Sequence, residues 1–297
     1  MIIDSHAHYA HPRFDGEFSA LCLQDGEYAL CRTERDALIE EMKKAGIVGF
    51  IEPSIGFDAI EKQIELVEKH SDCMKLSLGV HPTRCINNKF SSRKELKKYA
   101  LTHTPLAIGE TGLDYHYPGK MQYRARQKRW FVYQIKLADE LGLPLVLHVR
   151  DADKHALRIL KRHKKRLHGG VAHCYTGGVA LAEEYISLGF TLGIGGKLMC
   201  DNDKGRELCE VVKSVPLSAI LVETDAPFVL PDTDESLCSG KQRRKLCNSS
   251  FILPKLIERI AELRGEDAAE VENAIYENTL RAFGMAEEKT VGESEQE

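Results

Sequence analysis

The feature that most constrains the fold of this chain is an alternation of short apolar runs with helical segments. Eight runs rich in aliphatic and β-branched residues alternate with segments whose apolar residues recur at helical spacing. Several runs are apolar at almost every position, which is typical of parallel strands covered on both faces. The predicted strands start at Ile2 and then occupy residues 48–51, 76–82, 106–110, 143–149, 169–172, 190–194 and 219–225. The predicted helices occupy residues 34–45, 58–69, 92–103, 122–141, 153–165, 180–188, 203–212, 251–264 and 268–283.

Eight strand–helix units predict an α/β fold, a (β/α)8 TIM barrel formed by residues 1–285 as a single domain. An open, doubly wound sheet is the alternative, but such a sheet more often carries a glycine-rich loop after its first strand. Here that position carries His6-Ala7-His8. We expect residues 9–33 to form a long irregular loop and residues 286–297 to form an acidic disordered tail.

Composition argues against several classes of protein. The nine cysteines include no Cys-x-x-Cys pair, which favours reduced thiols in a cytoplasmic protein over a disulfide framework. No run is long and apolar enough for a membrane helix, and we expect no removable signal before the first strand. The formal net charge of −4 is that of residues 287–297, so the rest of the chain is neutral overall. Any binding of nucleic acid would therefore have to use a local basic patch.

Titratable side chains gather where the predicted strands end. In a barrel these ends converge on one mouth, where catalytic groups are found. His6 and His8 are two positions apart, so on a strand their side chains point to the same face. Burying many titratable groups without a partner is costly, and a shared cation would supply that partner. The residues at or near strand ends are His6, His8, His81, Glu110, His148, His173 and Asp225.

The types of ligand narrow the choice of metal. Imidazoles mixed with carboxylates suit zinc, manganese, iron or cobalt, and suit magnesium less well. Four of these histidines with Glu110 and Asp225 exceed the three or four protein ligands of a single catalytic zinc, so we expect two ions. Glu110 has two carboxylate oxygens and is the natural bridge between them. Two ions about 3.5–4 Å apart would hold a hydroxide as nucleophile and stabilise the entering and leaving oxygens of a displacement.

Seven short motifs follow one another along the chain. They are Ile3-Asp4-Ser5-His6-Ala7-His8, Gly79-Val80-His81-Pro82, Gly109-Glu110-Thr111-Gly112-Leu113-Asp114-Tyr115, Pro144 with His148-Val149-Arg150, His173-Cys174-Tyr175-Thr176-Gly177, Val222-Glu223-Thr224-Asp225-Ala226-Pro227 and Asn278-Thr279-Leu280-Arg281-Ala282-Phe283. Each motif is modest alone, but together they are specific. With them the chain resembles the TatD-related metal-dependent hydrolases, which carry deoxyribonuclease activity on an amidohydrolase-type TIM barrel, over residues 2–284.

The resemblance implies a set of site residues, a cofactor and a substrate. It implies two divalent metal ions (Mg²⁺, Mn²⁺ or Zn²⁺) and cleavage of DNA with 3′–5′ exonuclease-like action. One motif departs from the family, because members often have Arg-Asn-x-Pro where this chain has Cys247-Asn248-Ser249-Ser250. The ligands implied are His6, His8, Glu110 and Asp225 for one ion and Glu110, His148 and His173 for the other.

We expect Asp225 and Glu110 to act in catalysis as well as in binding the ions. Asp225 should ligate one ion and accept the proton of the attacking water, since a carboxylate at that position can do both. His81 could contact the substrate phosphate or a leaving oxygen, or it could only order the turn before Pro82. The sequence leaves these two roles open.

Arg150 is the fourth candidate catalytic residue. It shares the strand face of His148 and could bind a phosphate through a forked pair of hydrogen bonds. An ion pair with Glu223 or Asp114 is an equally simple role for Arg150. Glu223 has the strand parity of Asp225, and we expect it to orient a histidine.

Two basic runs could bind a polyanion. Residues 161–166 lie at the end of an outer helix, where a solvated helix end is the simpler interpretation. The second run follows the eighth strand and belongs to the mouth side of the barrel, so we expect it to bind the backbone of a nucleic acid. It consists of Lys241, Arg243, Arg244 and Lys245.

These expectations converge on an enzyme that hydrolyses phosphodiester bonds with two metal ions, with DNA as its partner. The alternative enzyme is a metal-dependent amidase, lactonase or deacylase, because the same hydroxide can attack a carbonyl carbon. A nucleic-acid-binding or partner-binding protein with a vestigial site is the third hypothesis, and the intact ligand set argues against it. We expect no association with membranes and infer no obligate protein partner.

Overall fold

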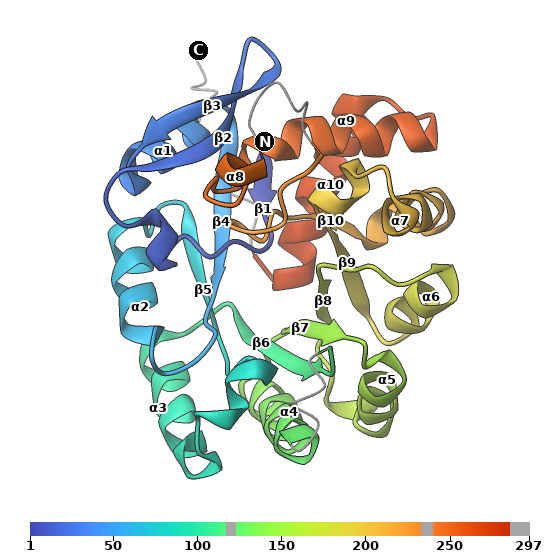
Figure 1. Cartoon of the computed structure of the whole chain (residues 1–297). Helices are drawn as coiled ribbons and strands as arrows, with labels where there is room; N and C mark the ends of the chain where they lie inside the picture. Colours follow the sequence, from blue (N-terminus) through green and yellow to red (C-terminus); the bar gives the residue numbers. More distant parts are fainter. Residues whose placement is uncertain (117–122, 233–239, 286–297) are drawn as a thin grey trace, which may run out of the picture.

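The computed structural model describes residues 1–116, 123–232 and 240–285. Within them, eight parallel strands form an inner ring that helices surround (Figure 1). The strand order is β1-β4-β5-β6-β7-β8-β9-β10, so every crossover leads to the neighbouring strand of the ring. The prediction of a single-domain (β/α)8 barrel is therefore confirmed, while the tail expected at residues 286–297 lies outside the described residues.

The observed elements agree with most of the predicted ranges to within a few residues. The strands of the ring are β1 (Ile2–Asp4), β4 (Ile47–Pro53), β5 (Met74–Leu78), β6 (Ala107–Asp114), β7 (Leu145–Arg150), β8 (Gly170–His173), β9 (Phe190–Ile194) and β10 (Ile220–Val222). The helices are α1 (Arg35–Lys44), α2 (Ile60–Lys69), α3 (Arg93–His103), α4 (Arg124–Leu141), α5 (Asp153–Arg162), α6 (Val179–Ser187), α7 (Asp203–Ser214), α8 (Gly240–Arg243), α9 (Leu253–Arg264) and α10 (Ala268–Phe283).

Backbone hydrogen bonds close the ring between β1 and β10. The N–H of Ser5 donates to the carbonyl of Val222 at 3.1 Å, and the N–H of Asp225 donates to the carbonyl of His6 at 2.9 Å. The N–H of His8 donates to the carbonyl of Ala226 at 2.7 Å. The seam thus continues past the ends of both strands, and it holds His6, His8 and Asp225 side by side.

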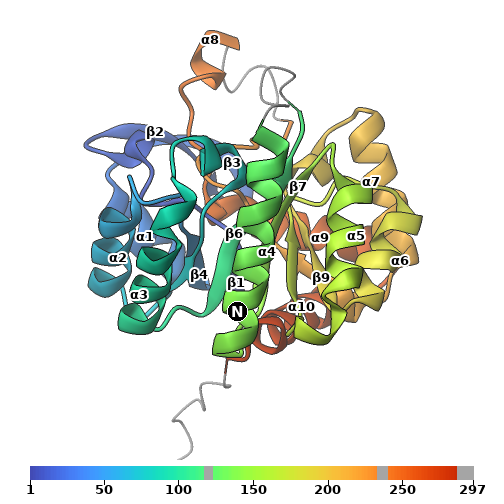
Figure 2. The ribbon, with the colours of Figure 1, turned by 90° about the horizontal axis from the view of Figure 1, so that it is seen from below.

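An apolar cluster fills the end of the barrel opposite the mouth. Phe283, at the end of α10, packs into a cluster with side chains from five strands of the ring. Figure 2 shows α10 at the end of the barrel that carries the N-terminus, with α8 at the opposite end. The strand residues in this cluster are Ile51, Ala107, Val146, Val171 and Leu221.

The prediction of an irregular loop over residues 9–33 was wrong. Much of this stretch forms an antiparallel hairpin of β2 (Phe18–Gln24) and β3 (Glu27–Thr33). Asp25 and Gly26 make its two-residue turn with φ values of 51° and 79°. A type I′ turn requires positive φ at both positions, and Asp-Gly is favoured there. The turn chemistry therefore outweighs the mixed composition of the stretch.

Two findings concern membrane-spanning helices and the state of the cysteines. No helix among the described residues is both long and apolar enough to span a bilayer. The eight cysteines within the described residues are all free thiols.

Candidate metal centre

All seven titratable residues predicted from the strand ends meet at the mouth of the barrel. Glu110, on β6, lies at their centre with its side chain 3% exposed. Every one of the five histidines places a ring nitrogen within 3.8 Å of a Glu110 carboxylate oxygen. Asp225 is the most exposed of the carboxylates here, at 19% of its side chain, and it faces the opening. The site is thus a buried cluster with one carboxylate at its entrance.

Four ligand atoms are spaced as they would be around one ion. The Nε2 atoms of His6 and His8 are 3.2 Å apart, and they lie 3.7 Å and 3.6 Å from Oε2 of Glu110. Oδ1 of Asp225 is 3.9 Å from Nε2 of His6 and 3.4 Å from Nε2 of His8. Ligands at about 2.1 Å from a tetrahedral ion are about 3.4 Å from one another. This half of the site therefore fits a metal ion.

The second oxygen of Glu110 faces a different set of imidazoles. Oε1 is 2.9 Å from Nδ1 of His148, 3.4 Å from Nε2 of His81 and 3.8 Å from Nε2 of His173. The rings of His6 and His173 stack at a centroid distance of 3.4 Å and join the two halves. The donor set of the second half also suits a cation.

The position of His81 is compatible with both of the roles that the sequence left open. It does not end a strand as predicted, because β5 stops at Leu78 and His81 instead caps the short 3-10 helix of Pro82–Ile86. Its Nδ1 accepts the N–H of Thr83 at 3.1 Å, while its Nε2 faces Glu110. Pro82 is the first residue of this short helix, and its ring fixes its own φ at a value that suits a first helical turn.

The electrostatics of the cluster favour a bound cation. Burial alone would raise the pKa of Glu110, but the charge of His81 and hydrogen bonds from His148 and His81 hold it well below its usual range. Burial and the neighbouring His173 lower the pKa of His6, which leaves a neutral imidazole. Burial would also lower the pKa of His8, but its hydrogen bond to Asp225 and the charge of Glu110 raise it to about 9. A metal ion bound here would therefore compete with a proton for the ring of His8.

Two buried carboxylates that the sequence reasoning missed position the histidine segment. Asp4 accepts hydrogen bonds from Oγ1 of Thr224 at 2.7 Å and Oγ of Ser250 at 2.6 Å. Glu52, on β4, accepts the N–H of Tyr9 at 2.6 Å. Burial raises the pKa of both carboxyls to about 7. Asp4 has the strand parity of His6, and this was the available signal for it.

Glu223 contacts a histidine, as its strand parity suggested. Its Oε1 lies 2.9 Å from Nδ1 of His173 and accepts the N–H of Cys174 at 2.5 Å. The carboxylate passes directly over Gly193, where an added Cβ would lie 2.0 Å from Oε2 of Glu223. Asp114 has a similar relation to the other half of the site, with Oδ2 3.2 Å from Nε2 of His148.

Replacing Glu223 by glutamine is expected to weaken metal binding or activity roughly 10- to 100-fold, because the amide no longer fixes the ring of His173 by charge. The measurement is activity as a function of metal concentration in protein first stripped by a chelator. Glu95→Gln, an exposed change on α3, is the matched control and should leave the curve in place. An unchanged metal dependence in Glu223→Gln would show that His173 needs no such partner.

Arg150 and the basic run after the eighth strand lie on the rim of the mouth. Arg150 is at the exposed end of β7, where it is paired in register with Asp114 of β6. The guanidinium of Arg243 donates to the carbonyls of Leu230 and Pro231. Arg244 and Lys245 have exposed side chains, while the side chain of residue 241 lies outside the described part of the chain.

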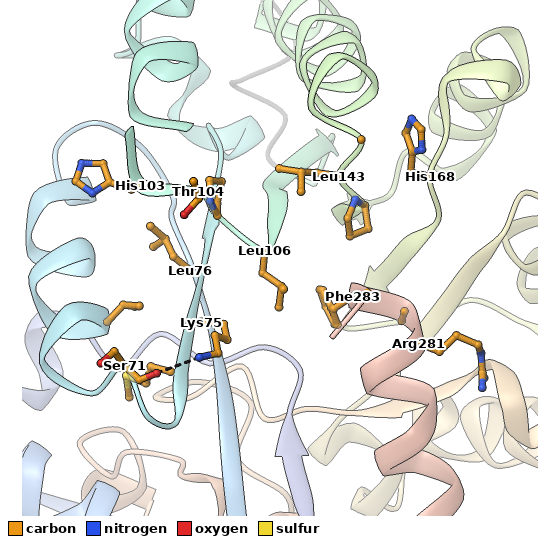
Figure 3. A pocket seen from close by; sticks show the side chains of 17 residues that line it. Ser71, Lys75, Leu76, His103, Thr104, Leu106, Leu143, His168, Arg281 and Phe283 are labelled. Carbon is orange, nitrogen blue, oxygen red and sulfur yellow. Dashed lines mark hydrogen bonds between the residues drawn. The ribbon is translucent and has the colours of Figure 1, made fainter. Parts of the chain in front are cut away.

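A cavity of about 680 Å³ lies at the other end of the barrel (Figure 3). Apolar side chains, among them Leu76, Leu106 and Phe283, line much of it. His103 and His168 also line this cavity, but neither belongs to a cluster of potential metal ligands within the described residues. Among the described residues, the clusters of potential metal ligands thus lie at the mouth and not in this cavity.

Comparison with known proteins agrees with this geometry. A family model described as TatD related DNase matches residues 3–284. The chain is 32% identical over 254 residues to the 3′-5′ ssDNA/RNA exonuclease TatD of Rahnella sp. (strain Y9602), covering 85% of this chain and 93% of that protein. It is 31% identical over 283 residues to the uncharacterized metal-dependent hydrolase YabD of Bacillus subtilis (strain 168), covering 95% and 99% of the two chains.

A solved structure shows the same architecture. The crystal structure of YJJV, a TatD homologue from Escherichia coli k12, superposes with a TM-score of 0.80 at 26% identity, covering 95% of this chain and 98% of that one. A hydrolase TatD family protein from Entamoeba histolytica superposes with a TM-score of 0.77 at 20% identity, over 96% and 98% of the two chains. The second of these supports the fold alone.

Proposed function

The chain belongs to the family of TatD-related DNases, and from this membership we propose that it is a metal-dependent nuclease that shortens single-stranded nucleic acid from the 3′ end. The reaction class is hydrolysis of phosphodiester bonds. DNA is the proposed substrate, and RNA is included because the Rahnella relative is named an exonuclease of both. An amidase, lactonase or deacylase is the weaker alternative.

The observation that carries the proposal is the position of Glu110 between two sets of imidazoles. One oxygen faces His6 and His8, and the other faces His148. We infer that two ions share this carboxylate. His6, His8, Glu110 and Asp225 would hold one ion, and Glu110, His148 and His173, with His81 beside them, would hold the other. The metal could be Mg²⁺, Mn²⁺ or Zn²⁺, and the mixture of nitrogen and oxygen ligands favours the last two.

When bound, divalent ions would supply an activated water and neutralise the charge that develops on the phosphate. The residues of the chain have separate tasks. Asp225 reaches toward the opening and would accept a proton at its carboxylate while its Oδ1 remains near His8. Glu223 and Asp114 would keep His173 and His148 in their ligating orientations. Arg150, on the rim, would bind a non-bridging phosphate oxygen.

One assay separates the nuclease from the acyl hydrolase. Protein stripped with a chelator and reloaded with Mg²⁺, Mn²⁺ or Zn²⁺ is given a single-stranded oligonucleotide labelled at its 5′ end, the same sequence as RNA, and a panel of esters, lactones and amides. A ladder of products shortened one nucleotide at a time, present only with metal, is the expected result. Turnover of an ester, lactone or amide without cleavage of nucleic acid would contradict the proposal.

Arg244 and Lys245, which are exposed near the mouth, should contribute to binding through the phosphate backbone. Reversing both charges (Arg244→Glu with Lys245→Glu) should weaken binding of single strands and reduce the slope of log K against log salt by up to about 1.4, at about 0.7 per phosphate contact. Fluorescence anisotropy at several salt concentrations measures this slope. The matched control reverses Lys164 and Lys165, which are exposed beyond the C-terminal end of the outer helix α5. Equal slopes in the two double variants would argue against a role for Arg244 and Lys245.

A further inference from the structure

One aromatic ring on the rim of the mouth faces solvent. Phe228 is 39% exposed, and it is the only exposed Phe, Tyr or Trp side chain among residues 1–116, 123–232 and 240–285. The other exposed large hydrophobic side chains of these residues are aliphatic. A single exposed apolar side chain is normal on a protein surface, so what distinguishes Phe228 is its place beside the candidate metal centre.

Hydrogen bonds hold the backbone on both sides of Phe228. A movement of this loop that buried the ring would break them. The N–H of Phe228 donates to the carbonyl of Asp225 at 2.8 Å. Asn248 holds both neighbours, since its N–H donates to the carbonyl of Pro227 at 3.1 Å and its Nδ2 to that of Val229 at 3.2 Å. The ring is therefore presented at a defined place, three residues after a candidate metal ligand.

Two histidine rings extend the aromatic surface from Phe228 to the metal centre. The ring of His11 meets Phe228 edge-to-face at 5.1 Å between centroids, and that of His8 meets it edge-to-face at 6.4 Å. His8 belongs to the candidate metal centre. Arg13 secures the same wall, because its guanidinium donates to the carbonyls of Pro227, Arg244 and Leu246. An aromatic wall thus runs from the solvent to the ligands.

We propose that Phe228, supported by His11, is a stacking platform for a nucleobase of the nucleotide being cleaved or of its 5′ neighbour. This inference rests on the proposed nuclease function and names the part of the substrate that is recognised. A flat base can stack on a phenyl ring whatever its sequence, because every base has a π-face. The platform would set the depth at which the 3′ end enters, and it would bring the phosphodiester next to Asp225 and His8.

The test compares a normal oligonucleotide with ones that lack a base near the 3′ end. Single strands labelled at the 5′ end carry either ordinary nucleotides or an abasic tetrahydrofuran residue at the last or the second-to-last position. We expect the wild-type protein to prefer the normal strand over one of the abasic strands by about tenfold in kcat/KM, from the loss of one stacked base. In Phe228→Ala this ratio should fall toward one, with most of the change in KM, and Phe228→Trp should restore it.

The control is Leu101→Ala, which removes an exposed side chain (59%) from α3, outside the mouth, and should leave the ratio unchanged. If Phe228→Ala slows all strands equally, or leaves the preference intact, the stacking platform is wrong while the nuclease function stands. If the wild-type protein cleaves no oligonucleotide under any metal, the proposed function fails and this inference fails with it.

Discussion

Glu110→Gln is expected to abolish cleavage of single-stranded DNA and to remove at least one of the two bound ions. The neutral amide keeps only one acceptor oxygen, and its NH₂ group cannot ligate a cation, so one set of imidazoles loses its shared partner. Removing a group that only supports a metal ligand lowers metal affinity or activity roughly 10- to 100-fold. The loss in Glu110→Gln should exceed that range. The low pKa of Glu110 means that the carboxylate, and not the acid, is the form that is replaced.

Metal content and rate should be measured on the same preparation of Glu110→Gln. Equilibrium dialysis followed by elemental analysis gives the number of ions for each chain, and the oligonucleotide ladder gives the rate. Glu95→Gln is the exposed control for the same chemical change, and thermal unfolding of the metal-free proteins checks that both fold. A Glu110→Gln protein that keeps two ions and normal turnover would falsify the bridging role.

Asp225→Asn should have a different signature, with metal retained and turnover lost. Asparagine keeps a side-chain oxygen at the position of Oδ1, which lies 3.4 Å from Nε2 of His8, but an amide cannot take up the proton of the attacking water. A positioned acid or base typically contributes about 10²- to 10⁴-fold, and a decrease of this size in kcat is expected. The comparison with Glu110→Gln therefore separates ligation from proton transfer.

Asparagine is the right replacement for structural reasons as well. Asp225 has a φ of 56°, in the left-handed region that asparagine tolerates and most other residues avoid. Asp25→Asn is the matched control, since Asp25 has a φ of 51° in the exposed turn of the β2–β3 hairpin. Its rate should equal that of the wild type. Loss of metal in Asp225→Asn would show that metal binding needs the charge of this carboxylate, and an unchanged rate would exclude it as the proton acceptor.

Most of the barrel could be predicted because its signals are local. A buried parallel strand is apolar along its whole length, and a helix on the outside of the ring repeats its apolar residues with the period of a helix. The β2–β3 hairpin differs from the predicted loop because Asp25-Gly26 favours a tight hairpin turn, which is a stronger local signal than the mixed composition of the stretch. The extent of β5 was overestimated because an apolar run does not show where hydrogen bonding to the neighbouring strand ends.

The ring of eight strands and the titratable residues at its strand ends can be predicted from the chain, because alternation and parity are local properties of a sequence. Which atoms face each other depends on how the whole chain folds. The fold placed Oε1 and Oε2 of Glu110 between different imidazoles, brought His81 against that carboxylate, and set Asp4 and Glu52 behind the histidine segment. It also left Phe228 in solvent beside the ligands. These contacts join residues up to 246 positions apart in the sequence. Such residues meet because the ring closes between β1 and β10.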